Sequence, residues 1–175
     1  VDEDTPLQRR PSIVEGDLQR ALRRTRMLKK IKQLKDHVIV CGAGSTGEQV
    51  IAELATANIP TVMIDADIDR LEHLAEDFKG HELRYIAGDA TDDNILEDAQ
   101  LGSCRGLVAA LANDKDNLFL VVSARQANPR ARIVARGSSL SMLSKLKKAG
   151  ASAVVSPNYI GGLRMVSELL RPQVV

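Results

Sequence analysis

The chain is poor in the residues on which several classes of protein depend. Among its 175 residues there is no Trp, and aromatic side chains make up only 2%. Domains that bind single-stranded nucleic acid stack bases on aromatic rings, so this composition disfavours them. Two cysteines, Cys41 and Cys104, are too few for a disulfide framework or a cysteine-based zinc site. No uncharged run approaches the ~20 residues that a membrane-spanning helix needs.

The charges divide the chain into two regions. Hydrophobic residues make up 44% and charged residues 27%, as in a globular domain. Residues 1–36 hold ten basic and six acidic side chains, whereas residues 37–175 hold fourteen and seventeen. We therefore expect a basic arm followed by a mildly acidic body. The chain opens at Val1 without Met or a visible signal peptide, so we expect it to be part of a longer protein.

The arm, residues 1–36, changes character along its length. Pro6 and Pro11 interrupt residues 1–15, which we expect to form a linker. From Asp17 to Leu34, apolar residues recur at three- and four-residue spacing, which predicts an amphipathic helix with a basic opposite side. Such a helix can pack on the body, lie beside anionic lipid headgroups or bind nucleic acid, and the arm alone does not decide.

The body, residues 37–157, alternates short apolar runs with segments of helical period. Apolar strands separated by helices are typical of a parallel sheet that is covered on both faces. The fold class is therefore α/β, a doubly wound six-stranded Rossmann sheet with strand order 3-2-1-4-5-6. A last helix is expected over 159–170. The expected strands span 37–41, 61–65, 83–87, 106–110, 132–136 and 153–156, and the helices between them span 46–57, 68–78, 94–99, 115–127 and 141–149.

A glycine pattern follows the first predicted strand and opens the next predicted helix. The segment Gly42-Ala43-Gly44-Ser45-Thr46-Gly47 has the form G-x-G-x-x-G. In nucleotide-binding folds the first glycine permits a tight turn, the second lets a pyrophosphate approach the backbone, and the third lets helix and strand pack closely. The amides at the helix N-terminus then face the anion. The alternative is a glycine-rich turn with no ligand.

An acidic residue ends the second predicted strand. Asp65, followed by Ala66 and Asp67, lies where a carboxylate accepts hydrogen bonds from ribose hydroxyls and repels a 2′-phosphate. The sequence therefore favours NAD(H), AMP, ADP or ATP over NADP. The alternative is that Asp65 only caps the next helix.

Three further strand ends carry candidate binding residues. Asp89, with Ala90 and Thr91, is expected near the adenine, unless Asp89 or Thr91 merely caps the following helix. Asn113 follows the fourth strand, across the crevice. Arg136 ends the fifth strand, where it can reach a phosphate or join a surface ion pair.

The sequence offers no catalytic equipment at this edge of the sheet. It contains no Tyr-x-x-x-Lys, and its three histidines, His37, His73 and His81, lie before a strand or on and just after a helix. Hydride transfer needs an acid or base beside the substrate. We therefore expect a ligand sensor and not an enzyme, with Cys41 buried and inert and with no metal site.

The ordered set of motifs resembles the RCK domain, also called the KTN or TrkA-N domain. These domains are cytoplasmic regulators of potassium channels and transporters. The resemblance covers about residues 15–175, and it is carried by DHVIVCGAG at 36–44, VMID at 62–65, GDAT at 88–91, IVAR at 133–136 and the segments 150–151 and 154–157.

The resemblance implies a function and partners. Residues 14–37 are similar to the segment that joins a pore-lining helix to an RCK domain, so it implies a potassium channel pore as partner through residues 1–36 and disfavours nucleic acid. It also implies a location on the cytoplasmic side of the membrane. Residues 158–175 would form the helix that crosses over between the two subunits of a homodimer. In the family, such dimers assemble into octameric gating rings. The family's C-terminal lobe would follow this helix and is absent from the sequence.

Two departures from the family pattern bear on the ligand. Many transporter-type members have Arg at the position of Ser45. Calcium-gated members use an acidic cluster that includes the counterpart of Asp89, but its further members would fall near Arg136 and Ser138, so calcium is not expected there. The competing functions are a soluble subunit of a Trk or Ktr transporter, a small NAD-dependent oxidoreductase and a nucleic-acid binder.

Overall fold

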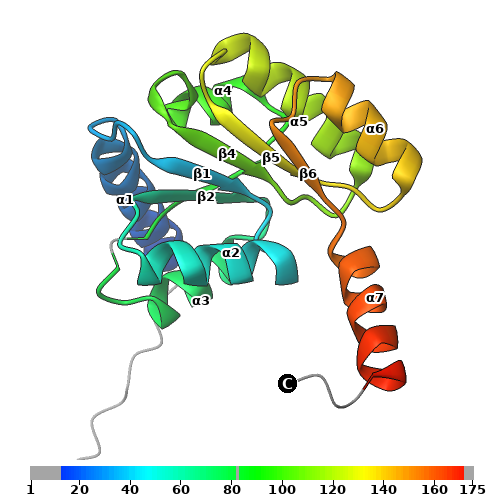
Figure 1. Cartoon of the computed structure of the whole chain (residues 1–175). Helices are drawn as coiled ribbons and strands as arrows, with labels where there is room; N and C mark the ends of the chain where they lie inside the picture. The colour runs from blue at the N-terminus through cyan, green and yellow to red at the C-terminus, as the bar shows by residue number, and fades with distance from the viewer. Residues whose placement is uncertain (1–12, 82, 172–175) are drawn as a thin grey trace, which may run out of the picture.

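The described residues form one six-stranded sheet, in which all neighbouring strands run parallel. The structure is a computed structural model that describes residues 13–81 and 83–171. The strand order is β3-β2-β1-β4-β5-β6 (Figure 1), which confirms the predicted doubly wound α/β fold. The strands are β1 (Val38–Cys41), β2 (Thr61–Asp65), β3 (Arg84–Ala87), β4 (Gly106–Ala109), β5 (Arg132–Arg136) and β6 (Ala153–Val155).

Helices cover the sheet from both sides. On one face, α2 (Ser45–Thr56) and α3 (Ile68–Asp77) pack against Val40 and Met63. On the other face lie α4 (Asp93–Asp98), a short 3-10 helix (Leu101–Ser103), α5 (Asp114–Ala127) and α6 (Leu140–Lys148). The side chains of β1 to β4 alternate between the two clusters, so the short apolar runs build two core layers.

The N-terminal helix differs from the expectation at its start. Helix α1 spans Ile13–Ile31, so residues 13–15 are helical and the prediction of a linker there is wrong. Ile13 and Val14 continue the apolar spacing of Leu18 and Leu22, which extends the helix. The C-terminal end of α1 packs on the body through the fully buried Ile31. The remainder of the predicted linker, residues 1–12, lies outside the described residues.

The last helix, α7 (Pro157–Leu170), projects away from the sheet (Figure 1). None of its residues is buried, and its large apolar side chains are between 53% and 80% exposed. Helix α5 also exposes Phe119 and Val122, while Leu120 and Val121 are buried. No helix among residues 13–81 and 83–171 combines the length and apolar content that crossing a bilayer requires.

Candidate functional site

The three glycines of the loop between β1 and α2 meet different surroundings. Gly42 has a φ of +98°, and a Cβ there would lie 2.6 Å from the carbonyl oxygen of Ala110. A Cβ on Gly47 would lie 1.8 Å from the carbonyl oxygen of Gly42. A Cβ on Gly44 would meet nothing within 4 Å. Two glycines therefore make the turn possible, and the third borders open space.

The N-terminus of α2 is available to an anion. Gly44 is the N-cap residue, and no side chain caps the helix. The first amides of a helix have no partner within it, and they carry partial positive charge. Ser45 and Thr46 begin the helix, while Ala43 is buried beneath the turn. The loop therefore presents backbone donors, in the manner of a phosphate-binding helix terminus.

Asp65 connects the glycine loop to the start of α3. Its Oδ2 accepts a hydrogen bond from the Ala43 amide at 2.7 Å, and its Oδ1 accepts one from the Asp67 amide at 2.8 Å. The N-cap of α3 is Asp67, which accepts from the Arg70 amide at 3.1 Å, so the alternative that Asp65 caps this helix is wrong. A carboxylate has about four acceptor positions, so Asp65 can also accept from a ribose. Ala66 lies exposed between the two acids.

Asp89 is fixed by its neighbour Thr91. Its Oδ1 accepts from the Thr91 amide at 2.8 Å and from the Thr91 hydroxyl at 2.7 Å. These two hydrogen bonds lower the pKa of Asp89, so the carboxylate is ionised. Ala90 is buried between them. Asp92 caps α4, so the alternative that Asp89 or Thr91 does so is wrong.

At the same edge of the sheet, the segment after β4 is held by a buried amide that the sequence did not reveal. Asn117 accepts from the Leu111 amide at 2.9 Å and donates to the carbonyls of Leu111 at 3.0 Å and Arg136 at 3.1 Å. Asn113 caps α5 by accepting from the Lys115 amide at 2.8 Å. The sequence signal for Asn117 is an amide between the charged first residues of α5 and the apolar residues 118–122, which does not reveal its partners.

Arg136 has a partly exposed side chain at the end of β5. Among the ion pairs of the described residues, none involves Arg136, so the surface ion pair proposed as its alternative role is not observed. Ser138 donates to the Asp114 carboxylate through its amide and its hydroxyl.

This edge of the sheet is rich in carboxylates. The first turns of α3, α4 and α5 carry acidic side chains, namely Asp69, Asp93, Asp114 and Asp116, and the caps Asp67 and Asp92 add two more. An anionic ligand must therefore be bound through backbone amides and the few cations nearby. The Arg70 guanidinium is one of these, but it lies 3.9 Å from Asp65 and 3.7 Å from Asp67.

The histidines and cysteines lie away from this edge or are inaccessible. His37 is fully buried, and its Nε2 lies 2.8 Å from the Ala99 carbonyl. Burial lowers the pKa of His37 and raises that of the Cys41 thiol. His73 and His81 are exposed. Among residues 13–81 and 83–171, no group of three or more His, Cys, Asp or Glu could hold a metal ion.

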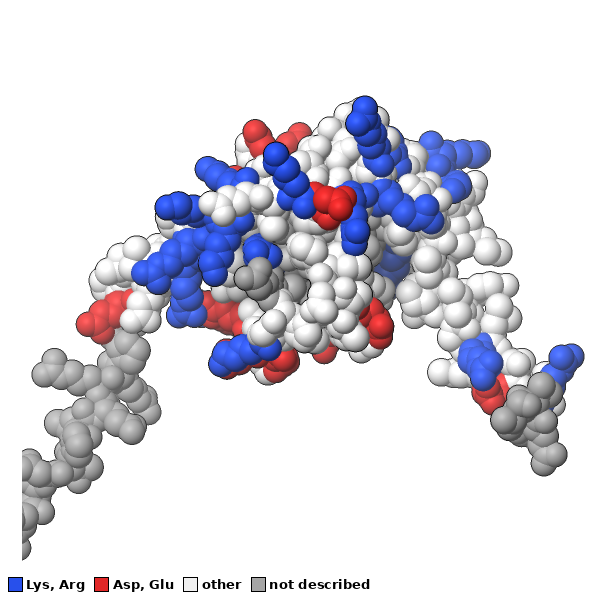
Figure 2. Space-filling view, turned by 60° about the vertical axis from the view of Figure 1, so that its left-hand side comes forward, with Lys and Arg blue, Asp and Glu red and all other residues white. Residues whose placement is uncertain are grey.

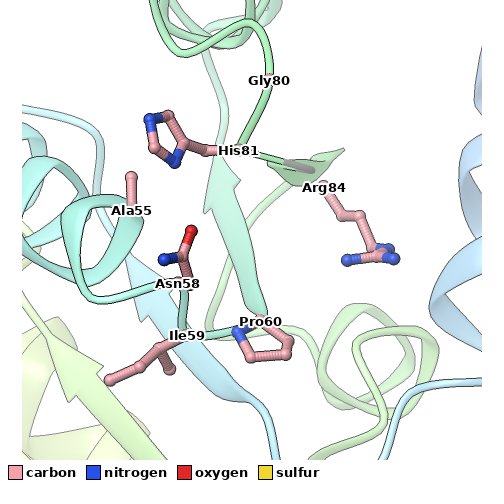
Figure 3. A pocket seen from close by; sticks show the side chains of 7 residues that line it. All are labelled: Ala55, Asn58, Ile59, Pro60, Gly80, His81 and Arg84. Atoms are coloured by element: carbon pink, nitrogen blue, oxygen red, sulfur yellow. The ribbon is translucent and has the colours of Figure 1, made fainter.

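A partly open pocket lies at the opposite edge of the sheet. It has a volume of about 210 Å³, and its lining includes Asn58, Pro60, His81 and Arg84, near the starts of β2 and β3 (Figure 3). The asparagine and histidine turn toward each other there, whereas the Arg84 side chain points away. Ligands of open α/β sheets bind at the carboxyl ends of the strands, so we do not assign the nucleotide to this pocket.

Comparison with known proteins places the chain in a family. The TrkA-N domain model matches residues 38–157. Probable potassium channel protein 2 of Methanocaldococcus jannaschii is 42% identical over 163 residues, which are 93% of this chain and 47% of that protein. The chain spans about half the length of the curated relatives it matches.

Solved structures agree with this assignment. The TrkA-N domain of the inner membrane protein ybaL from Escherichia coli superposes with a TM-score of 0.72 at 26% identity, covering 78% of this chain and 98% of that one. GsuK bound to ADP gives a TM-score of 0.64 at 25% identity, covering 73% of this chain and 33% of that one. This chain, which places the glycine loop and Asp65 at the carboxyl ends of its parallel strands, therefore belongs to the TrkA-N domain family.

Proposed function

We propose that this chain is the ligand-sensing domain of a potassium channel, and that it binds NAD(H) or an adenine nucleotide without catalysing a reaction. The observation that carries the proposal is the open glycine loop. Gly44 borders free space at an uncapped helix N-terminus, and the adjacent Ala43 amide is held by Asp65. A family relative named as a potassium channel and a structural relative bound to ADP support the proposal.

The carboxylates define which nucleotide fits. The ribose hydroxyls donate to Asp65, and the pyrophosphate or phosphate lies on the amides of residues 44–47. The adenine lies near Asp89, Ala90 and Thr91, with Asn113 and Arg136 across the crevice. A 2′-phosphate would approach both Asp65 and Asp67, so NADP is excluded in favour of NAD(H), AMP, ADP or ATP. Calcium is not part of the proposal, since no group of three or more His, Cys, Asp or Glu among the described residues could hold a metal ion.

The two terminal segments provide the connections to the pore and to other subunits. Residues 1–36 lead to the pore on the cytoplasmic side of the membrane, with α1 as the described part of this linker. Residues 37–157 form the ligand-binding body. The exposed apolar side chains of α7, within residues 158–175, pack across the two-fold axis of a homodimer, because such faces mark interfaces. Dimers then assemble into an octameric ring that transmits ligand binding to the pore.

Calorimetry with the variant Asp65→Asn tests the ligand site. We expect the affinity for NAD⁺, NADH, AMP, ADP or ATP, whichever binds most tightly, to fall by about 1–3 kcal/mol, because a charged acceptor is lost. Asp69→Asn is the matched control, since it removes a carboxylate from the same helix region without touching the loop, and its affinity should be unchanged. Equal affinities for the native chain and the Asp65 variant would rule out this site.

Light scattering at micromolar concentration tests the dimer. The native chain should have about twice the mass of 19.0 kDa. Leu163→Asp should yield monomers because it places a charge on the exposed apolar face of α7, while Ser167→Asp on the same helix is the control. A native chain that remains a monomer would contradict the crossover role of α7 and leave the nucleotide proposal standing.

A further inference from the structure

A cavity lies between α1 and the outer strand β3, away from the glycine loop. Its volume is about 280 Å³, and apolar side chains form much of its wall, including Met27 and Leu28 of α1, Ile68 of α3 and Ile86 of β3. An enclosed cavity of about 150 Å³ lined only by apolar side chains holds benzene. The pocket beside α1 is partly open and has charged residues in its lining, and its volume is enough for an apolar body of at least that size.

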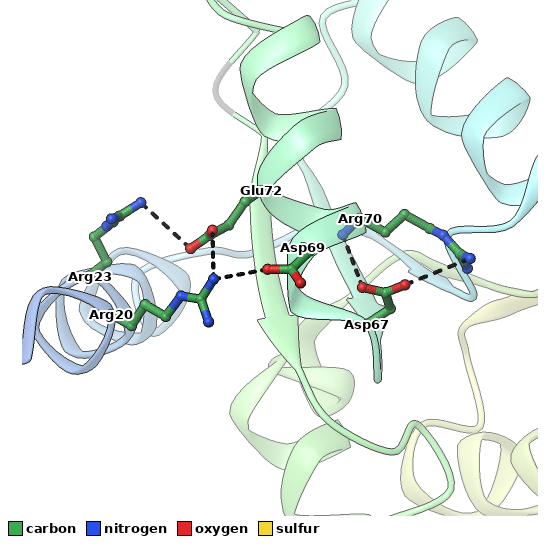
Figure 4. A network of polar contacts seen from close by, with 6 residues as sticks. All are labelled: Arg20, Arg23, Asp67, Asp69, Arg70 and Glu72. Carbon is green, nitrogen blue, oxygen red and sulfur yellow. Dashed lines mark hydrogen bonds and ion pairs between the residues drawn. The ribbon is translucent and has the colours of Figure 1, made fainter. Parts of the chain in front are cut away.

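Charged residues also line the cavity. Arg20 lies 2.8 Å from Asp69 and 3.7 Å from Glu72, and Arg23 lies 3.5 Å from Glu72 (Figure 4). These contacts hold α1 against α3 and neutralise Glu72, which itself lines the cavity. Two of the three arginines in the lining are therefore already paired with carboxylates.

The third arginine, Arg24, has no hydrogen-bond or ion-pair partner among the described residues. The lining and its ion-pair partners thus hold three guanidinium groups, Arg20, Arg23 and Arg24, and two carboxylates, Asp69 and Glu72, which leaves one positive charge. Figure 2 brings the α1 side of the molecule forward and shows Lys and Arg side chains gathered over it. An entering anion would meet a positive surface there.

Tyr85 gives further support from the wall of the cavity. Burial, together with the nearby Glu72, raises the pKa of its hydroxyl. The phenol is therefore neutral and remains a hydrogen-bond donor. Tyr85 of β3 and Arg24 of α1 thus provide the cavity with a neutral hydrogen-bond donor and a guanidinium that has no ion-pair partner among the described residues.

We propose that this cavity binds a small amphiphilic anion, whose apolar body lies against Met27, Leu28 and Ile86 and whose single carboxylate or phosphate pairs with Arg24. The site is separate from the nucleotide site and does not depend on it. Such a ligand contacts α1 and β3 at once, and therefore fastens α1 to the body. Its source is either a free metabolite with an alkyl or aryl carboxylate or an anionic lipid of the membrane.

The test uses the full 175-residue chain and decanoate as the probe. Titration should shift the NMR methyl signals of Met27, Ile68 and Ile86 saturably, without shifting the amides of residues 42–47. Decanol, which has no charge, should bind at least tenfold more weakly, because a charged hydrogen bond is lost. Decanoate should also slow hydrogen exchange of the α1 amides.

A pair of variants isolates the guanidinium. Arg24→Gln should weaken decanoate binding about tenfold, whereas Arg26→Gln, which removes a cation of the same helix outside the cavity, should leave it unchanged. Equal effects of the two variants would show nonspecific attraction to the basic helix and overturn the proposal.

Vesicles distinguish the two sources. Methyl shifts with monomeric decanoate alone assign the site to a free carboxylate, and shifts with phosphatidylglycerol vesicles, but not phosphatidylcholine vesicles, assign it to membrane lipid. No saturable shift with either decanoate or phosphatidylglycerol would overturn the proposal. Because the glycine loop takes no part, loss of nucleotide binding in a separate titration leaves this result unaffected.

Discussion

The sheet has two halves, β1 to β3 and β4 to β6, which follow the same topology. They differ in the turn that follows the first strand of each half. After β1, the chain turns through Gly42 and starts α2 at the uncapped Gly44, which leaves the helix amides open. After β4, the corresponding turn is filled by the buried Asn117, whose side chain satisfies both the amide and the carbonyl of Leu111. Asn117 and Asn113 occupy the amides of Leu111 and Lys115 in this turn, whereas no side chain caps α2, so we expect the phosphate to bind in the first half.

Among substitutions that test this difference between the halves, Gly47→Ala should have the largest effect on stability. The new methyl group would lie 1.8 Å from the carbonyl oxygen of Gly42, which is backbone and cannot move aside cheaply. We expect a loss of about 3 kcal/mol in the free energy of unfolding, at the upper end for overpacking. Urea denaturation measures it. A variant as stable as the native chain would show that α2 and β1 can separate.

A smaller loss in the free energy of unfolding is expected from a substitution in the second half of the sheet. Asn117→Leu removes one acceptor and two donor contacts, and it takes away the side-chain partner of partly buried backbone groups of Leu111 and Arg136. We expect about 2 kcal/mol of destabilisation in urea denaturation. Asn113→Ala, which removes only the cap of α5, should cost about 1 kcal/mol. If Asn113→Ala cost more than Asn117→Leu, the role we assign to the buried amide would be wrong.

The stability of the fold should depend on pH through His37, which joins the start of β1 to the segment after α4. His37, before β1, lies 2.8 Å from the Ala99 carbonyl just after α4, and burial lowers its pKa in the folded state. As pH falls below about 6.5, the unfolded chain takes up a proton that the folded chain resists, so stability falls by at most about 1.4 kcal/mol per pH unit. His37→Gln should show a shallower decline in thermal unfolding between pH 7 and pH 5. Parallel declines in both proteins would assign the effect to other groups.

The smallest effect on stability should come from Gly44→Val, although its effect on binding should be complete. The backbone of Gly44 is extended, with φ of −71°, and the added side chain would enter open space. The free energy of unfolding should change by less than about 0.5 kcal/mol, because no packed group is displaced. Nucleotide binding should be abolished in calorimetry, since the side chain would fill the place of the phosphate. Binding by a folded variant would contradict the role of the loop.

The sequence was informative where one pattern decides the structure. The runs at 61–65 and 132–136 became β2 and β5 with the predicted bounds, because apolar strands of a parallel sheet have few competing interpretations. The glycine spacing likewise located the open turn. The cap of α4 was not predictable, since Asp89, Thr91 and Asp92 are all good caps and only the chain geometry selects Asp92.

Contacts between residues far apart in the sequence also could not be predicted. The partners of Asn117 lie in two different strand ends, and Arg20 reaches Asp69 from a helix far away in the sequence. Neither pairing has a local signature, because each depends on how the elements meet in space. Periodicity predicted that α1 would be amphipathic, but it could not show that two arginines of α1 face carboxylates of α3.

The central position of β1 has a consequence for the order in which the chain can fold. Val38 pairs with Thr61 on one side and with the distant Gly106 on the other. During synthesis from the N-terminus, β1, β2 and β3 are complete before β4 leaves the ribosome. Until then, one edge of β1 and the adjoining apolar surface lack their partner, and unpaired edges of this kind promote aggregation. The newborn chain therefore passes through an interval in which it needs protection, and that interval ends when β4 emerges and pairs with β1.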